Sequence, residues 1–103
     1  MIQYKIDFEN LEWESPMEGV KCKSYVNGDK RVRLIRYTKA MPQHWCDKGH
    51  FGYVLAGEIE IEYPNEKYTY KGGDGVFIPD GEEHKHKGRV IGESATVIFV
   101  ENV

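Results

Sequence analysis

Apolar and polar side chains alternate along much of the chain, a pattern that is typical of strands with one buried face. The alternation predicts one strand over residues 2–8 and another over residues 58–63, whose glutamates would form a solvated face. A last strand is expected over residues 93–100, and its apolar end at residues 97–100 suggests that it is covered on both faces. These segments are short and no long helix is expected between them, which favours an all-β fold.

Turn-forming residues separate these segments and indicate how neighbouring strands pair. Asn27-Gly28 lies between residues 20–26 and residues 31–37, and Asn-Gly readily takes the positive φ angles of a tight turn, so a β-hairpin is expected there. Turns rich in glycine, proline and asparagine recur through the second half of the chain. About eight short strands joined by such turns predict an antiparallel barrel or jelly roll.

Length and composition narrow the choice of function. The chain has 103 residues, of which 40% are hydrophobic, so we expect a single domain over residues 1–103. Seventeen acidic residues against 14 basic ones give a net charge of −3, which argues against nucleic acid or a membrane surface as a partner. No apolar run is long enough for a membrane span or a signal peptide, and a cytoplasmic protein is expected. Cys22 and Cys46 are too few for a disulfide scaffold and should be thiols.

Potential metal ligands gather in the middle of the chain. His44 and Cys46 would share one face of a short strand, and His50 follows after a turn. His84 would reach the same place from a later strand. Imidazole and thiolate both bind zinc and late first-row metals, although any one of these residues alone is more often a solvated or packed side chain. The prediction therefore depends on their convergence, and His86, flanked by lysines, is expected at the periphery of the site.

Residues 73–84 resemble the second sequence motif of the cupin superfamily. That motif reads G-x5-P-x-G-x2-H-x3-N, and its first four fixed positions are matched here by Gly73, Pro79, Gly81 and His84. Gly88 stands where the motif has its final asparagine.

The first cupin motif, G-x5-H-x-H-x3,4-E-x6-G, is matched less fully. His44 occupies the position of the first histidine and Gly57 that of the last glycine. Cys46 stands in place of the second histidine, His50 in place of the glutamate, and Thr38 in place of the first glycine.

The resemblance implies both a fold and a site. The fold would be an antiparallel double-stranded β-helix, the jelly-roll barrel of cupins, and family members commonly form homodimers, so a homodimer is expected. The cofactor would be a divalent transition metal (Zn, Fe, Ni or Mn), held by His44, Cys46, His50 and His84. If Cys46 is a ligand, the closed four-coordinate set suits zinc. If it is not, three imidazoles leave open positions, as in the three-histidine iron sites of cupin thiol dioxygenases.

Two kinds of function fit these residues. The first is a metal-dependent enzyme, dioxygenase-like or isomerase/lyase-like, that acts on a small molecule through catalytic residues the sequence does not identify. The alternative is a non-catalytic barrel that binds or senses a small ligand, since a fold does not fix a function. In both cases aromatic side chains would line the substrate site, namely Tyr37, Tyr53, Tyr63 and Phe77.

Overall fold

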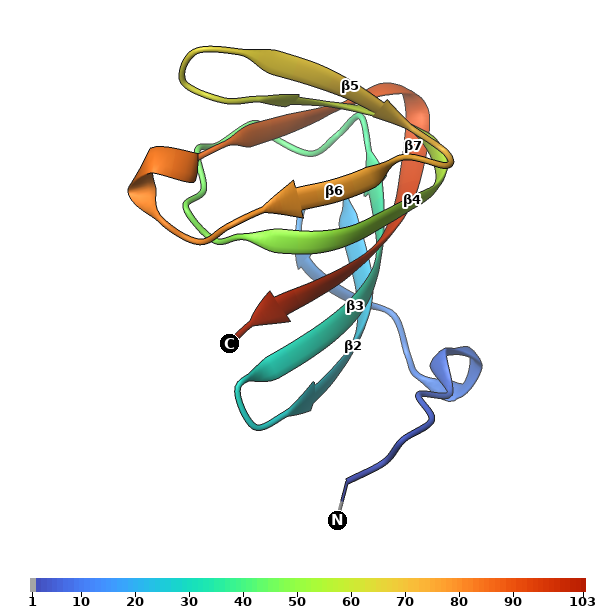
Figure 1. The fold of residues 1–103 in the computed structure, drawn as a ribbon. Coiled ribbons are helices and arrows are strands. Elements are labelled where there is room, and N and C mark those ends of the chain that lie inside the picture. The colour runs from blue at the N-terminus through green and yellow to red at the C-terminus, as the bar shows by residue number, and fades with distance from the viewer. Residues whose placement is uncertain (1) are drawn as a thin grey trace.

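The computed structural model describes residues 2–103, which form an antiparallel β-sheet of seven strands that curls around an apolar core (Figure 1). This confirms the expected all-β class. The strands are β1 (Glu14–Met17), β2 (Val20–Asn27), β3 (Lys30–Thr38), β4 (His50–Glu62), β5 (Lys67–Lys71), β6 (Gly75–Ile78) and β7 (Lys87–Asn102). Two short 3-10 turns, η1 (Phe8–Asn10) and η2 (Glu82–His84), complete the elements.

Two long strands, β4 and β7, hold the barrel together. The strand order is β1-β2-β3-β7-β4-β5, and β6 pairs with β4 outside this path. The first half of β4 pairs with β6 and with the end of β7, whereas its second half pairs with β5 and with the start of β7. The register shifts near Gly57, whose φ of 80° lies in the region that favours glycine. The bend there lets both long strands contribute to two walls of the barrel.

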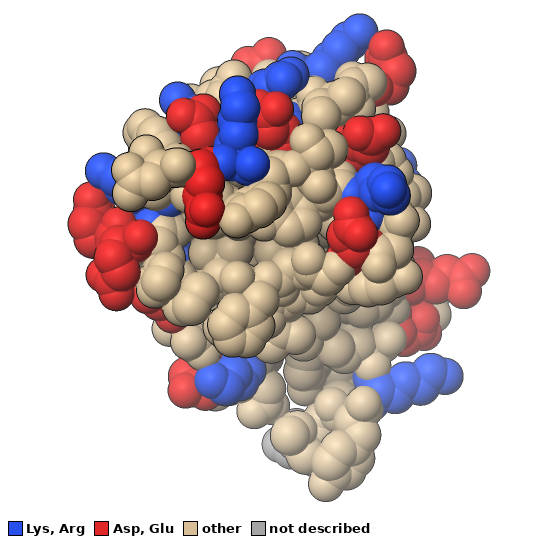
Figure 2. Space-filling view, turned by 45° about the horizontal axis from the view of Figure 1, so that its top comes forward, with Lys and Arg blue, Asp and Glu red and all other residues tan. Residues whose placement is uncertain are grey.

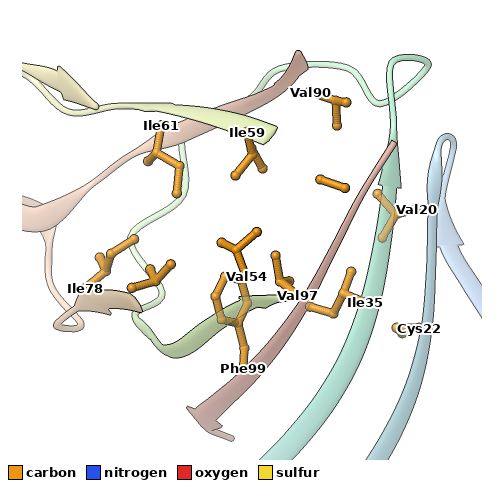
Figure 3. Packing of buried hydrophobic residues seen from close by; sticks show 12 residues of the cluster. Val20, Cys22, Ile35, Val54, Ile59, Ile61, Ile78, Val90, Val97 and Phe99 are labelled. Carbon is orange, nitrogen blue, oxygen red and sulfur yellow. The ribbon is translucent and has the colours of Figure 1, made fainter. Parts of the chain in front are cut away.

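The core follows directly from the alternation of the strands. Inward-facing aliphatic side chains of β3, β4 and β7 meet in the middle of the barrel, and Ile35, Val54 and Val97 are fully buried (Figure 3). Ile59 and Ile61 are buried as expected, while Glu58 is exposed and Glu60 and Glu62 are partly exposed. On the face drawn in Figure 2, acidic and basic side chains lie interspersed.

The expected hairpin is confirmed. Asn27 pairs with Lys30 across a two-residue turn, and Gly28 in that turn has a φ of 61°. The strands on either side, β2 and β3, stay in register from this turn to the pair of Val20 and Tyr37. The sequence therefore placed this hairpin within a residue of its observed bounds.

The expected strand over residues 2–8 is wrong. These residues form no strand and project away from the barrel (Figure 1). Their hydrogen bonds to the barrel include one from the Gln3 amide to the Tyr25 hydroxyl and one from Lys23 Nζ to the Phe8 carbonyl. The alternating pattern shows only that one side of the segment is apolar, and a strand also needs a partner; β1 occupies the outer edge of β2 only at residues 20–22, and residues 2–8 do not extend that pairing.

Two further expectations are corrected by the second half of the chain. Residues 39–49 are irregular, and the short strand expected at His44 and Cys46 is reduced to an isolated bridge between Cys46 and His86. The last strand, β7, starts earlier than expected, and its outward-facing Val100 is exposed. The end of β7 is therefore covered on one face only. No helix within residues 2–103 has the length and apolar character needed to cross a membrane.

Candidate functional site

A cavity of about 240 Å³ opens between the β1–β3 side of the barrel, the start and end of β7, and the irregular residues 39–49. Its walls are mostly apolar and include Met17, Met41, Ile59, Ile61 and Phe99. The polar side chains that line it are Arg33, Tyr37, His44, Cys46, His50, His86 and Lys87. Three of the four residues expected to bind a metal therefore lie around one cavity.

His86 is the most buried of the cavity histidines, with 6% of its surface exposed. Its Nδ1 donates a hydrogen bond to the backbone carbonyl of His84 at 3.1 Å, while its buried Nε2 has no partner within residues 2–103. Burial lowers the pKa of His86, and the nearby His50 and His44 lower it further. The neutral ring therefore offers the Nε2 lone pair to a ligand.

His50 is held from two sides at the start of β4. Its Nδ1 donates to the carboxylate of Glu101 at 2.5 Å, and its ring stacks on Phe99 at 4.7 Å between centroids. The centroid of the His86 ring lies 5.2 Å away in an edge-on arrangement. With Nδ1 bound to the carboxylate, Nε2 is the nitrogen that remains for a metal or substrate. A carboxylate behind a histidine is the usual partner of a metal-binding imidazole.

Glu101 is a charged residue inside the barrel, with 4% of its surface exposed. It accepts hydrogen bonds from Arg33 Nε and Nη2, both at 2.6 Å, and from Arg31 Nε at 2.9 Å. Burial alone would raise its pKa, but the hydrogen bonds from His50 and Arg33 and the charge of Arg33 outweigh burial and hold the pKa at about 2. Glu101 is therefore ionised at neutral pH.

His44 and Cys46 come from the irregular residues 39–49. The Nδ1 of His44 lies 3.4 Å from the carbonyl of Pro42, so the preferred tautomer again leaves Nε2 free. Cys46 is a half-buried free thiol, fixed by its backbone hydrogen bonds to His86. The donors thus suit a divalent metal in type. Within residues 2–103, however, no three His, Cys, Asp or Glu side chains stand in an arrangement that could hold a metal ion.

His84 is not brought to the cavity. It ends η2, its side chain is half-exposed, and its Nε2 lies 3.8 Å from a carboxylate oxygen of Glu83. The expectation that His86 is peripheral is wrong, because His86 is buried and lines the cavity. The physical reason is that residues 82–84 form a 3-10 turn, so two-residue alternation does not place His84 and His86 on one face.

The four aromatic residues expected at the substrate site separate into two groups. Tyr37 lines the cavity, and burial raises its pKa, so its hydroxyl stays protonated. Tyr63 lies nearby, its ring centroid 6.3 Å from that of His86 and its hydroxyl bonded to that of Tyr70 at 2.7 Å. Tyr53 and Phe77 are on the outer face of β4 and β6 and do not line the cavity. Since His50 points inward, the alternation of β4 turns Tyr53 outward.

Sequence reasoning missed Arg33 and Glu101. Both stand at positions that alternate with outward-facing residues, since Glu101 continues the inward series of Val97 and Phe99, and Arg33 precedes the buried Ile35 by two residues. A charged residue at a core position of a strand is the signal that could have identified them.

The chain is similar to known proteins in sequence and in fold. The family model described as "Cupin domain" matches residues 27–101. The fold is similar to that of KdgF from Halomonas sp., at 20% identity and a TM-score of 0.74, over 99% of this chain and 94% of that one. It is also similar to an RmlC-like cupin from Shewanella frigidimarina, at 20% identity and a TM-score of 0.76, over 98% and 91% of the two chains.

A third similar structure is a sugar phosphate isomerase from Silicibacter pomeroyi, at 16% identity and a TM-score of 0.73, over 96% of this chain and 75% of that one. No curated protein matches the sequence.

Proposed function

Since this chain belongs to the cupin family, we propose that its cavity is the site of a metal-dependent enzyme that acts on a small organic molecule. The observation that carries the proposal is the buried Nε2 of His86, which has no hydrogen-bond partner within residues 2–103. A buried acceptor without a partner is unfavourable by roughly 1–3 kcal/mol unless a ligand satisfies it. This buried nitrogen therefore supports a ligand that binds there.

The ligands would be His44, His50 and His86, because all three line the cavity and each presents Nδ1 to an oxygen atom. This set replaces the expected His84 with His86. His44 belongs to an irregular segment and is exposed, so it can approach the other two rings without loss of core packing. Cys46 lies beside them and would add a thiolate. A bound divalent metal would supply Lewis acidity to an oxygen of the substrate.

The remaining residues of the cavity would bind and orient the substrate. The protonated hydroxyl of Tyr37 can donate a hydrogen bond to a substrate oxygen. Met17, Ile59 and Phe99 exclude water from the apolar side. Glu101 holds the ring of His50 in place and stays ionised. These roles fit isomerase- or lyase-type chemistry as well as dioxygen chemistry, and they require only a small substrate.

A cobalt titration of chelator-treated protein tests the metal site. His86→Ala should weaken Co²⁺ binding by at least about 10-fold, because it removes the most buried donor. His84→Ala is the matched control, two residues away and outside the cavity, and should leave the affinity unchanged. Loss of binding in His84→Ala with retention in His86→Ala would contradict this ligand set, and an absence of Co²⁺ binding to the parent protein would overturn the metal proposal.

The role of Cys46 is tested in the same titration. A thiolate ligand gives Co²⁺ an intense near-ultraviolet band, so loss of that band in Cys46→Ser assigns sulfur as a ligand. An unchanged spectrum in Cys46→Ser leaves a three-histidine site. Circular dichroism of each variant establishes that the barrel is intact.

A further inference from the structure

The guanidinium of Arg33 is a polar group of the cavity that has no part in the proposed metal site. Its side chain is 16% exposed and lies on the inner face of β3. Nε and Nη2 each donate one hydrogen bond to Glu101, which uses two of the five N–H donors of a guanidinium. Within residues 2–103 the side chain makes no other hydrogen bond. Arg33 is therefore held rigidly while its remaining donors stay available to a ligand.

The charges at this end of the cavity do not cancel. Glu101 has two guanidinium partners, Arg33 and Arg31, so one carboxylate faces two positive charges. Lys87, which also lines the cavity, lies 4.0 Å from the carboxylate of Glu62, and no acidic side chain of residues 2–103 lines the cavity. With Lys87 paired, the guanidiniums of Arg31 and Arg33 exceed the Glu101 carboxylate by one positive charge, which favours an anion beside Arg33 in a mostly apolar cavity.

The surroundings of Arg33 indicate what kind of anion fits. Tyr37 lies four residues after Arg33 on β3 and also lines the cavity, where it offers a protonated hydroxyl. Apolar side chains line much of the rest of the cavity, among them Met17, Ile59 and Phe99, the last directly across from Arg33 on β7. At about 240 Å³, the cavity is smaller than the pockets that hold drug-sized ligands. A small molecule with one anionic end and an apolar body matches this distribution.

We propose that Arg33 and Tyr37 bind the carboxylate of a small, largely apolar organic acid, so that the cavity selects monoanionic substrates. The inference rests on the proposed function, because it assigns a substrate class to the same cavity. A planar carboxylate matches the planar guanidinium, and a single negative charge matches the single excess positive charge. A phosphate dianion would leave one negative charge uncompensated. Glu101 keeps the guanidinium oriented and acts as a positioning residue.

The test is a binding titration of chelator-treated protein, so that a metal ion makes no contribution. Benzoate and isovalerate are compared with their neutral isosteres, benzamide and isovaleramide, and with phenyl phosphate, by calorimetry up to about 10 mM. At least one acid should bind at least about 10-fold more tightly than its amide and more tightly than phenyl phosphate. Equal binding of acid and amide, tighter binding of phenyl phosphate, or no binding of either acid would overturn the proposal.

Substitutions at Arg33 and Tyr37 test whether the carboxylate binds at these two residues. Arg33→Lys keeps the charge but loses the planar donors, and should weaken binding of the acid at least about 10-fold while binding of the amide changes little. Arg36→Lys is the matched control, because Arg36 is on the same strand, faces outward and lies over the ring of Trp13. Thermal unfolding of both variants shows whether they remain folded. Tyr37→Phe, which removes one oxygen atom, provides a second variant that should weaken binding about 3- to 10-fold.

Unchanged affinity for the acid in both Arg33→Lys and Tyr37→Phe would contradict the proposal. These results are independent of the cobalt titration. If the protein binds the acid through Arg33 but does not bind Co²⁺, the metal site is overturned and the carboxylate site is kept. If it binds Co²⁺ but does not bind the acid through Arg33, the carboxylate site is overturned and the metal site is kept.

Discussion

Each of the three histidines proposed as ligands contacts an oxygen atom through Nδ1. They are His44, His50 and His86. The partners are the carbonyl of Pro42, the carboxylate of Glu101 and the carbonyl of His84. A hydrogen bond of this kind selects the Nδ1–H tautomer and orients the ring, so Nε2 carries the lone pair. The neighbouring oxygens thus favour the tautomer and the ring orientation that leave Nε2 free for a ligand.

The ionised Glu101 also makes stability depend on pH. Its pKa is about 2 in the folded protein and near its usual value of 4.5 when unfolded, so its contribution is present above about pH 5 and is lost as the pH falls towards 2. Urea unfolding of metal-free protein should show a loss of about 3 kcal/mol over this range. Glu101→Gln should be less stable at pH 7 and should lack this part of the pH dependence.

The matched control is Glu93→Gln, since Glu93 is exposed and its only ion pair within residues 2–103 is with Lys39. This variant should follow the parent protein at every pH. If the free energy of unfolding changes with pH in the same way in Glu101→Gln and in the parent protein, the Glu101 carboxylate is not the cause of the pH dependence.

At the scale of elements, the close approach of β4 and β7 depends on glycine. A Cβ added to Gly52 would overlap the backbone oxygen of Ile98 on β7, whereas a Cβ on Gly75 of β6 would meet its nearest atom at an ordinary 3.7 Å. Gly52→Ala should therefore destabilise the barrel by about 1–3 kcal/mol, because the two strands must separate. Gly75→Ala should stay within about 1 kcal/mol of the parent.

Urea unfolding of the two alanine variants checks this difference. If Gly52→Ala and Gly75→Ala have similar urea midpoints, the absence of a side chain at residue 52 is not what allows β4 and β7 to lie so close together. The slope of the transition should not change, since both variants expose the same surface on unfolding.

The strands could be predicted from sequence because their signal is local and repeats every two residues. The hairpin at Asn27-Gly28 and the inward Ile59 and Ile61 are confirmed for this reason. The arm of residues 2–8 has the same alternation but joins no strand, because pairing with a partner strand is a property of the whole sheet and not of the local pattern.

The candidate site could be predicted only in part. His44, Cys46 and His50 line one cavity, and their short separation along the chain is the local signal on which the expected site was based. The choice between His84 and His86 depends on one 3-10 turn, and such a turn has no repeating pattern to detect. Glu101 and Arg33 meet only because β3 pairs with β7, across a sequence separation of 68 residues.

At the scale of the whole molecule, the outer face of the sheet is apolar where four strands run side by side. Phe77, Phe51, Val100 and Val32 are neighbours in one row across β6, β4, β7 and β3. The rings of Phe51 and Phe77 are 4.6 Å apart, and Phe77 is 79% exposed. A contiguous apolar face of this kind is typical of sheet-to-sheet packing between two protein chains.

We therefore expect a homodimer that packs through this row. Phe77→Glu should convert it to a monomer, as measured by sedimentation equilibrium, because it would bury a charge at the centre of the contact. Tyr68→Glu is the control, since Tyr68 is a similarly exposed aromatic residue on β5 and pairs with the inward-facing Ile61. A parent protein that sediments as a monomer, or a dimer that persists in Phe77→Glu, would contradict this interface.

The isolated bridge between Cys46 and His86 also has a kinetic consequence. The amide of Cys46 donates to the carbonyl of His86 at 2.8 Å, and the amide of His86 donates back at 2.9 Å. Both bonds break when residues 39–49 lift from the barrel, so the two amides should exchange with solvent deuterium at one common rate. We expect the same fluctuation to uncover Nε2 of His86, which is buried in the folded protein. The exchange rate of these two amides would then measure how often this nitrogen becomes accessible from the side of residues 39–49.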